Sequence, residues 1–176
     1  MLYTKKGDKG TTTLFGCDQK ISKSSAITEA LGCLDELNSY LGICKTKSKR
    51  KIDRVLIDRI QNNIFIIQAQ VAGAKKNFMN TEIEHTENII NKIEKKLTKI
   101  KTFVVPGANE ISAHFDFART IARRAERRVV AVHDENLVKI EDEALVFLNR
   151  LSSLLYALAR HAAQKTGIEK TPKYQT

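Results

Sequence analysis

A cluster of arginines between residues 109 and 134 is the part of the sequence best suited to chemistry. Arg119, Arg123 and Arg127 follow one another at intervals of four residues, so on a helix they share one face. Further charges lie among them: Arg124, Glu126 and Arg128. Because a guanidinium group binds phosphate through two parallel hydrogen bonds, a polyphosphate would relieve the repulsion within this cluster. The alternative is an ordinary solvated helix face, and this stretch alone does not decide between the two.

The first 24 residues form a second candidate for phosphate binding. Within them, residues 4–16 combine three glycines, four threonines and three lysines: Gly7, Gly10, Gly16, Thr4, Thr11, Thr12, Thr13, Lys5, Lys6 and Lys9. Glycines let a backbone approach a ligand closely, and the hydroxyl and ammonium groups suit a triphosphate. The Walker A pattern GxxxxGK[ST] is absent, and a flexible arm is the plainer interpretation of such a segment.

The cysteines and histidines indicate neither a metal site nor a nucleophilic triad. The chain has an odd number of cysteines, Cys17, Cys33 and Cys44, and their spacing is not that of a metal site. This pattern favours reduced thiols in a cytoplasmic setting. Cys33 and Cys44 fit packing positions better than a catalytic role. The four histidines are scattered along the chain: His85, His114, His133 and His161.

Apolar residues recur at helical spacing in five stretches that position these groups. The first stretch begins at about residue 25, and the other four span about 52–74, 81–100, 109–134 and 141–165. In the fourth stretch one apolar stripe lies beside the arginines: Ile111, Phe115, Ala118, Ala122, Ala125, Val129 and Val132. Long helices with short connections predict an all-α, five-helix up-and-down bundle with an extended N-terminal arm.

A chain of 176 residues with 42% apolar content is expected to form a single domain. We divide it into an arm at 1–24, a bundle at 25–167 that Gly167 ends, and a polar tail at 168–176. No apolar run is long enough to cross a bilayer, and no signal peptide is expected at Met1.

The net charge of +10 admits nucleic acid or small polyanions as partners. Much of the excess lies in one cluster between the first two predicted helices: Lys45, Lys47, Lys49, Arg50, Lys51 and Arg54. We interpret this cluster as a solvated turn. The competing function is a basic helical nucleic-acid-binding protein, which would leave the Gly/Thr arm unexplained.

Four blocks of sequence together resemble the PduO-type ATP:corrinoid (cob(I)alamin) adenosyltransferases. They are YTKKGDKGTTTLFG at 3–16, EALGCLDELNSYLG at 29–42, FVVPGANEISAHFDFARTIARRAERRVV at 103–130 and FLNRLSSLLYALAR at 147–160. The resemblance implies a homotrimer of five-helix bundles with ATP at the subunit interface. It also implies transfer of the 5′-deoxyadenosyl group of ATP to the cobalt of cob(I)alamin, with release of triphosphate.

The resemblance assigns ATP to residues of both candidate segments. Those expected to bind it are Thr4, Lys5, Lys6, Gly7, Thr12, Thr13, Lys23, Arg123, Glu126, Arg127 and Asn149. It places Phe103 at the lower face of the corrin, where it keeps an axial ligand off cobalt. Asp35 resembles an acid that also serves the corrinoid site and pairs with Arg119 across subunits. The implied catalytic set is therefore Arg119, Arg123, Asp35 and Phe103.

The implied reaction needs orientation and charge stabilisation more than a protein nucleophile, because Co(I) is itself strongly nucleophilic. Mg²⁺ is expected on the ATP phosphates, held by phosphate oxygens and water and not by protein side chains. A corrinoid reductase and an adenosylcobalamin-dependent enzyme are the partners implied, with no nucleic acid and no membrane. One departure from the family is Ala108, where a second glycine usually follows Pro106-Gly107.

Overall fold

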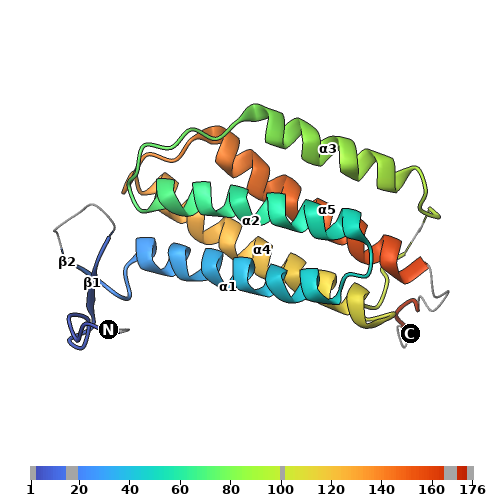
Figure 1. Ribbon diagram of the computed structural model, residues 1–176, viewed down its shortest axis with the longest axis horizontal. Helices are drawn as coiled ribbons and strands as arrows, with labels where there is room; N and C mark the ends of the chain where they lie inside the picture. Colours follow the sequence, from blue (N-terminus) through green and yellow to red (C-terminus); the bar gives the residue numbers. More distant parts are fainter. Residues whose placement is uncertain (1–2, 15–19, 100–101, 165–169, 174–176) are drawn as a thin grey trace.

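The computed structural model describes residues 3–14, 20–99, 102–164 and 170–173. These ranges contain five helices: α1 (Ala26–Lys47), α2 (Lys51–Val71), α3 (Asn80–Glu94), α4 (Glu110–Asp134) and α5 (Asp142–Gln164). Successive helices run in opposite directions along the long axis of the molecule (Figure 1). The predicted all-α, five-helix up-and-down bundle is confirmed. Cys17, Gly16 and Gly167 lie outside the described residues.

The N-terminal arm contains a short strand pair that the sequence analysis did not predict. Strands β1 (Thr11–Thr13) and β2 (Lys20–Ser22) are antiparallel, with Thr12 opposite Ile21. The β-branched threonines suit an extended backbone. The pair lies beyond the N-terminal end of α1 (Figure 1), and Ser25 caps that helix by accepting a hydrogen bond from the backbone N–H of Thr28.

Helix α4 lies at the centre of the packing, against α5 on one side and α1 on the other, while α2 packs on α1 and α3 on α5. Its predicted apolar stripe faces the core: Phe115, Ala118, Ala122, Ala125, Val129 and Val132 are buried, and Ile111 is half-buried. The alanines let neighbouring helices approach closely, so the stripe and the arginines beside it are held in a defined orientation.

Two helices end earlier than the sequence predicted. Helix α2 stops at Val71, not near residue 74, because Gly73 adopts a left-handed backbone (φ +88°). The N–H of Gly73 then bonds to the carbonyl of Gln70, and that of Ala74 bonds to the carbonyl of Ala69. Helix α3 ends at Glu94, not near residue 100, and residues 95–97 continue as a turn. The turn places the lysines after Glu94 at the end of the bundle.

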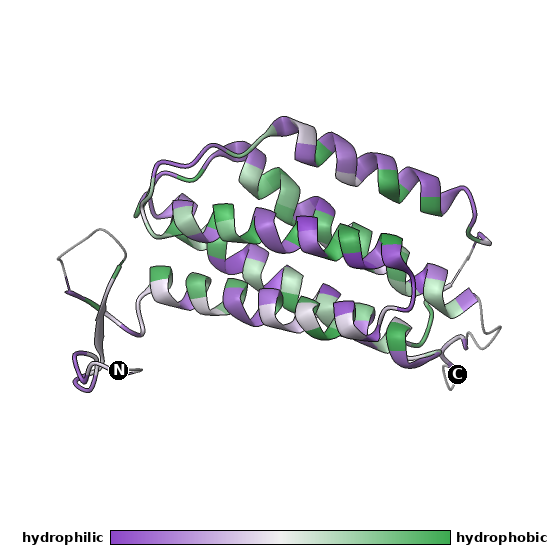
Figure 2. Ribbon diagram, in the orientation of Figure 1, coloured by the Kyte–Doolittle hydropathy of each residue, from purple (hydrophilic) through white to green (hydrophobic). Residues whose placement is uncertain are grey.

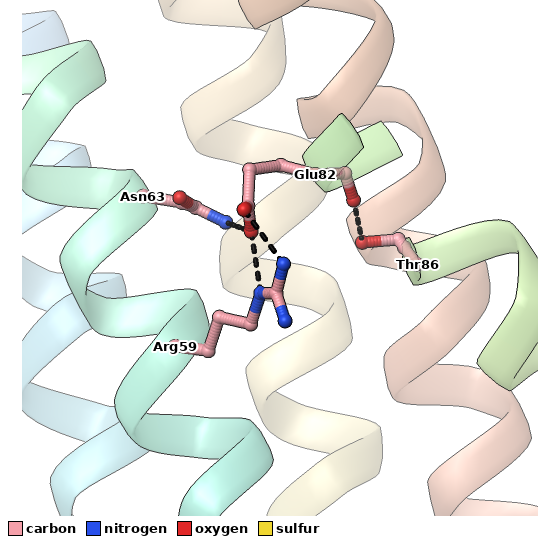
Figure 3. Close-up of polar contacts among 4 residues, drawn as sticks. All are labelled: Arg59, Asn63, Glu82 and Thr86. Carbon is pink, nitrogen blue, oxygen red and sulfur yellow. Dashed lines mark hydrogen bonds and ion pairs between the residues drawn. The ribbon is translucent and has the colours of Figure 1, made fainter. Parts of the chain in front are cut away.

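Helix α3 is mostly hydrophilic (Figure 2) and relies on polar contacts for part of its attachment. Glu82 accepts two hydrogen bonds from Arg59 of α2, at 2.6 and 2.7 Å, and a third from Asn63 at 2.9 Å. Figure 3 shows these side chains converging between the two helices, with Thr86 one turn further along α3. The hydrogen bond from Arg59 holds the pKa of the Glu82 carboxyl below its ordinary value, and Asn63 adds to this, while burial opposes it.

Candidate functional site

A cavity of about 740 Å³ lies between α3, α4 and α5. From α4 it is lined by Arg119 and Arg123, two of the arginines that the sequence singled out. The other lining residues come from α3, the turn after it, and α5: Ile90, Glu94, Lys95, Leu97, Thr98, Lys99, Ser152, Ser153, Tyr156, Ala157 and Arg160. None of these was predicted as a site residue from the sequence, because their common location depends on how the three helices pack.

The cavity carries an excess of positive charge. Within the described chain, no ion pair joins the side chain of Arg119, Arg123, Lys95 or Lys99 to an acid, and Glu94 is the one carboxylate among the described lining residues. The Nε atom of Arg119 is buried and has no hydrogen-bond partner there. A buried donor without a partner is costly, so the cavity is suited to an anionic ligand that supplies acceptors.

Glu126 of α4 and Asn149 of α5, both predicted to bind ATP, lie in contact. Asn149 donates from Nδ2 to Glu126 at 2.9 Å and accepts at Oδ1 from Arg150 at 3.0 Å. Arg150 in turn donates to Glu87 of α3 at 2.7 Å. The amide of Asn149 is therefore held at both ends, and its orientation is fixed by α3, α4 and α5 together.

The remaining arginines of α4 take different directions. Arg127 donates from Nη1 to the backbone carbonyl of Arg123 at 3.0 Å, one turn earlier on the same helix. Arg124 pairs with Glu36 of α1 and does not line the cavity. The arginines of α4 are close together in the sequence, but the helix turns by about 100° per residue. They therefore face different sides of the helix.

The predicted phosphate-binding arm is folded into a compact turn. The N–H groups of Asp8 and Gly10 donate to the carbonyls of Lys5 and Gly7. Lys5 and Gly10 have left-handed backbones, with φ of 59° and 76°. The ammonium end of Lys23 lies across Gly7, where an added Cβ would come within 2.9 Å of Nζ. Lys23 and the turn are therefore brought together, and their assignment to ATP stays a prediction.

The arm and the arginine cavity lie in different parts of the single chain. Thr12 and Thr13 line a hollow against α1 and α2, next to Phe65. Among the described residues, no hydrogen bond or ion pair joins the arm to α4. One copy of the chain therefore does not assemble all of the predicted ATP-binding residues into one pocket.

Asp35 is likewise apart from Arg119. It lines a hollow of about 380 Å³ between α1 and α2, together with Asn38, whose side chain is 5% exposed and whose Oδ1 atom has no described partner. Arg119 lines the cavity on the other side of α4. The predicted pair between these two residues was expected across subunits, and it stays a prediction.

Phe103 lies in the connection between α3 and α4 and is 78% exposed. The same segment is tied to the C-terminal tail, because the N–H of Val105 donates to the carbonyl of Lys170 at 2.8 Å. Gly107 has a left-handed backbone (φ +93°), whereas Ala108 does not have a positive φ. The departure at Ala108 thus falls where the backbone does not require glycine.

The described cysteines and histidines form no metal-binding group. Cys33 and Cys44 are buried free thiols, and burial raises the pKa of the Cys44 thiol to about 12. His114 contacts Tyr40, and His161 contacts Arg50. No set of three or more His, Cys, Asp or Glu residues in the described chain is placed to hold a metal ion.

The basic cluster at residues 45–54 is largely engaged by groups of the protein itself. Lys45 pairs with Asp58, Lys47 with Glu110 at 2.6 Å, and Arg50 with Asp53 at 3.7 Å. Arg54 donates to the carbonyls of Ser48 and Lys49. These contacts give no support to the nucleic-acid-binding alternative. None of the described helices is both long enough and apolar enough to span a membrane.

A family model described as "Cobalamin adenosyltransferase" matches residues 2–162. Corrinoid adenosyltransferase PduO of Citrobacter freundii is 36% identical over 177 residues, and the match covers 95% of this chain and 52% of that protein. PduO of Salmonella typhimurium is 37% identical, with 90% and 48% covered. The chain thus spans about half the length of these two relatives. The Bacillus subtilis corrinoid adenosyltransferase is 34% identical, with 95% and 89% covered.

Solved structures agree with the sequence comparison. A variant PduO-type ATP:corrinoid adenosyltransferase from Lactobacillus reuteri, complexed with cobalamin and ATP, superimposes with a TM-score of 0.89 at 29% identity, covering 99% of this chain and 97% of that one. A second variant from the same organism, complexed with ATP, gives a TM-score of 0.87 at 29% identity, with coverage of 99% and 100%.

Proposed function

The chain belongs to the cobalamin adenosyltransferase family, and from that premise we propose that it is an ATP:corrinoid adenosyltransferase. It transfers the 5′-deoxyadenosyl group of ATP to the cobalt of a Co(I) corrinoid. The observation that supports this most directly is the cavity between α3, α4 and α5. Arg119 and Arg123, which line it, form no ion pair among the described residues, and the contacting pair of Glu126 and Asn149 lies about one helical turn from the lining residues Arg123 and Ser152.

The chemistry consists of one displacement at carbon. Co(I) donates an electron pair to C5′ of ATP, a cobalt–carbon bond forms, and the bond from C5′ to the triphosphate oxygen breaks. Cobalt is formally oxidised to Co(III), and the electron pair of the broken bond leaves with triphosphate. Arg123 and Arg127 stabilise the charge that gathers on this leaving group, and Asn149 and Glu126 orient the nucleotide.

ATP binding in this proposal requires two copies of the chain. The turn at residues 4–10 with Lys23 lies on one part of a chain, and the arginines of α4 lie on another. A closed homotrimer places the arm of one subunit over the phosphates held by α4 of the next. The same arrangement brings Asp35 to Arg119 of a neighbouring subunit and supplies an acceptor for the unpartnered Nε atom.

Mg²⁺ fits this site as an ion coordinated by the ATP phosphates. Phosphate oxygens and water would complete its coordination, because Mg²⁺ keeps several waters and commonly binds substrate phosphates. Bound there, the ion neutralises part of the triphosphate charge.

Phe103 is proposed to cover the lower face of the corrin. An axial donor stabilises the more oxidised cobalt, so a hydrophobic side chain that excludes it raises the Co(II)/Co(I) potential. A reductase must still supply the electron, and an adenosylcobalamin-dependent enzyme uses the product. Free buried thiols and an oxygen-sensitive Co(I) substrate both suit a reducing cytoplasmic location.

An anaerobic spectroscopic assay tests the proposed function. Chemically reduced cob(I)alamin, Mg-ATP and the protein are mixed, and the absorption spectrum is followed over minutes. We expect conversion to the spectrum of a light-sensitive alkylcobalamin, and no conversion when ATP or the protein is omitted. If folded protein that binds ATP leaves cob(I)alamin unchanged, the proposed activity is wrong.

A further inference from the structure

Two lysines after the end of α3 form a second basic wall of the arginine cavity. Lys95 and Lys99 line it from the α3 side, whereas Arg119 and Arg123 line it from α4. The turn that carries Lys95 is held by hydrogen bonds from the N–H of Lys96 to Ile93 and from the N–H of Leu97 to Glu94. The first of the two lysines is therefore part of an ordered turn next to the cavity.

These lysines are not needed to balance acids of the protein. In the described chain neither has an ion-pair partner, and Glu94 is the one carboxylate that shares the cavity with them. The proposed function already places the triphosphate against α4 and a neighbouring arm that contains Lys5, Lys6 and Lys23. The α3 wall is thus left for a second anion, because cations that face one another uncompensated repel.

The location of this wall indicates which anion it meets. Lys99 precedes Phe103 by four residues in the same connection. Tyr156 and Arg160 line both the arginine cavity and a small adjoining hollow, which is bounded by Val104, Pro106 and Ala108. The cavity that the two lysines line therefore adjoins the segment that carries the proposed lower-face residue.

The corrinoid substrate has a matching anion on that side. The amide side chains of the ring are neutral, but cobalamin carries one phosphodiester, in the nucleotide loop below the ring. When the axial base is kept off cobalt, this loop is released from the metal, and its phosphodiester needs another partner.

We propose that Lys95 and Lys99 bind the nucleotide-loop phosphodiester of cobalamin and thereby favour cobalamin over corrinoids that lack the loop. An ammonium group is a good point-charge partner for phosphate. Specificity then arises as a difference between two affinities, since the smaller corrinoid loses this contact and keeps the others. The inference rests on the proposed function, because it needs the lower face of the corrinoid to lie at Phe103, in the segment that adjoins this cavity.

The test compares two substrates in a charge-matched pair of variants. The double variant Lys95→Gln/Lys99→Gln removes both proposed contacts, and Lys92→Gln/Lys96→Gln removes the same charge from lysines that do not line the cavity. Initial rates are measured with chemically reduced cobalamin and with reduced cobinamide, which has the ring but no nucleotide loop. Mg-ATP is held saturating, and the KM for ATP is measured separately.

We expect Lys95→Gln/Lys99→Gln to raise the KM for cobalamin about fivefold or more, the size that charge pairs of two exposed lysines support. The KM for cobinamide, the KM for ATP and both kcat values stay within about twofold of wild type. The control variant behaves as wild type with both corrinoids.

Three other results overturn the inference in distinguishable ways. An equal rise in KM for both corrinoids means that the lysines act on the ring or on the fold. A rise in the KM for ATP means that they hold the triphosphate. If wild-type protein adenosylates neither corrinoid, the proposed function itself fails, whatever the variants do.

Discussion

At the scale of single residues, the same side chain has different tasks according to its position on α4. Arg119 and Arg123 line the cavity, Arg124 pairs with Glu36 of α1, and Arg127 contacts the backbone one turn back. Since residues four apart share a helix face and adjacent residues do not, the arginine run supplies both a site and a surface ion pair.

Arg123→Ala is expected to lower kcat/KM by at least tenfold, about 1.4 kcal/mol of transition-state stabilisation, because it removes a charge proposed to stabilise the leaving triphosphate. The measurement is the initial rate with reduced cobalamin and Mg-ATP. Arg124→Ala is the matched control, and its exposed pair with Glu36 should contribute little. Equal kinetics in Arg123→Ala and wild type would remove this part of α4 from the active site.

Phe103→Ala is expected to bind ATP normally and to react near the wild-type rate with cobalamin already reduced to Co(I). When the reaction starts from Co(II) and a reductant, the variant should be slow, because an axial donor regains access to cobalt and lowers its potential. The two assays are run side by side on the same protein. Unchanged turnover in the coupled reduction assay would contradict the role proposed for Phe103.

At the scale of elements, α3 differs from the other helices because polar contacts supply part of its attachment. Its described residues bury only Ile83 and Thr86, whereas Glu82 is held by Arg59 and Asn63, and Glu87 by Arg150. The turn after this helix carries the lysine wall of the cavity, so the polar contacts also help to position the site.

Glu82→Gln is expected to lower the free energy of unfolding by about 1–2 kcal/mol at neutral pH, because charge-assisted hydrogen bonds to an 18%-exposed carboxylate are weakened. Since the folded state lowers the pKa of Glu82, the advantage of wild type is full above the ordinary value of 4.5. This advantage disappears as the pH falls through the lower pKa that Glu82 has in the folded state. Urea unfolding of both proteins across this pH range measures the advantage.

Glu84→Gln on the same helix is the control for this prediction. Glu84 is exposed, and its described contact is one long hydrogen bond of 3.3 Å from Asn80. The prediction is wrong if the difference in free energy of unfolding between Glu82→Gln and wild type stays constant down to acid pH. In that case the ionised Glu82 carboxylate is not the source of the difference.

At the scale of the whole molecule, the arm and the arginine cavity belong to different regions of one chain. The strand pair extends beyond the start of α1, while Phe103 belongs to the connection between α3 and α4 at the other end of the bundle (Figure 1). If the active site uses both the arm and α4, each site must combine the arm of one subunit with α4 of a neighbouring subunit.

Mixing two defective variants tests this sharing. Lys6→Ala/Lys23→Ala impairs only the arm and Arg123→Ala only the helix, so each alone should lose at least tenfold in activity. Co-refolding them in equal amounts should restore about a quarter of wild-type activity, since random assembly pairs an intact arm with an intact helix at one site in four. If each active site used the arm and α4 of the same chain, no activity would return.

The helices and their buried faces could be predicted from the sequence. In α4 and α5 the apolar residues recur at helical spacing and form one stripe, and only one orientation of each helix buries that stripe. Helix ends were less predictable. The end of α2 depends on Gly73 adopting a left-handed backbone, and the strand pair of the arm consists of two three-residue segments that are too short to give a clear alternating pattern. The contact between Asn149 and Glu126 depends on how α5 packs against α4, and the assignment of both residues to ATP, made from the family resemblance, stays a prediction.

The sequence by itself determined the helical fold, the family and the chemical character of the segments proposed to bind ATP, because these depend on local periodicity and on residue types at fixed spacing. Only the tertiary structure decided that Lys95, Lys99 and Tyr156 share a cavity with Arg119, and that Asp35 and the arm lie elsewhere. Those facts depend on which helices become neighbours. Neighbours are chosen by the packing of side chains from distant parts of the chain, which no local pattern contains.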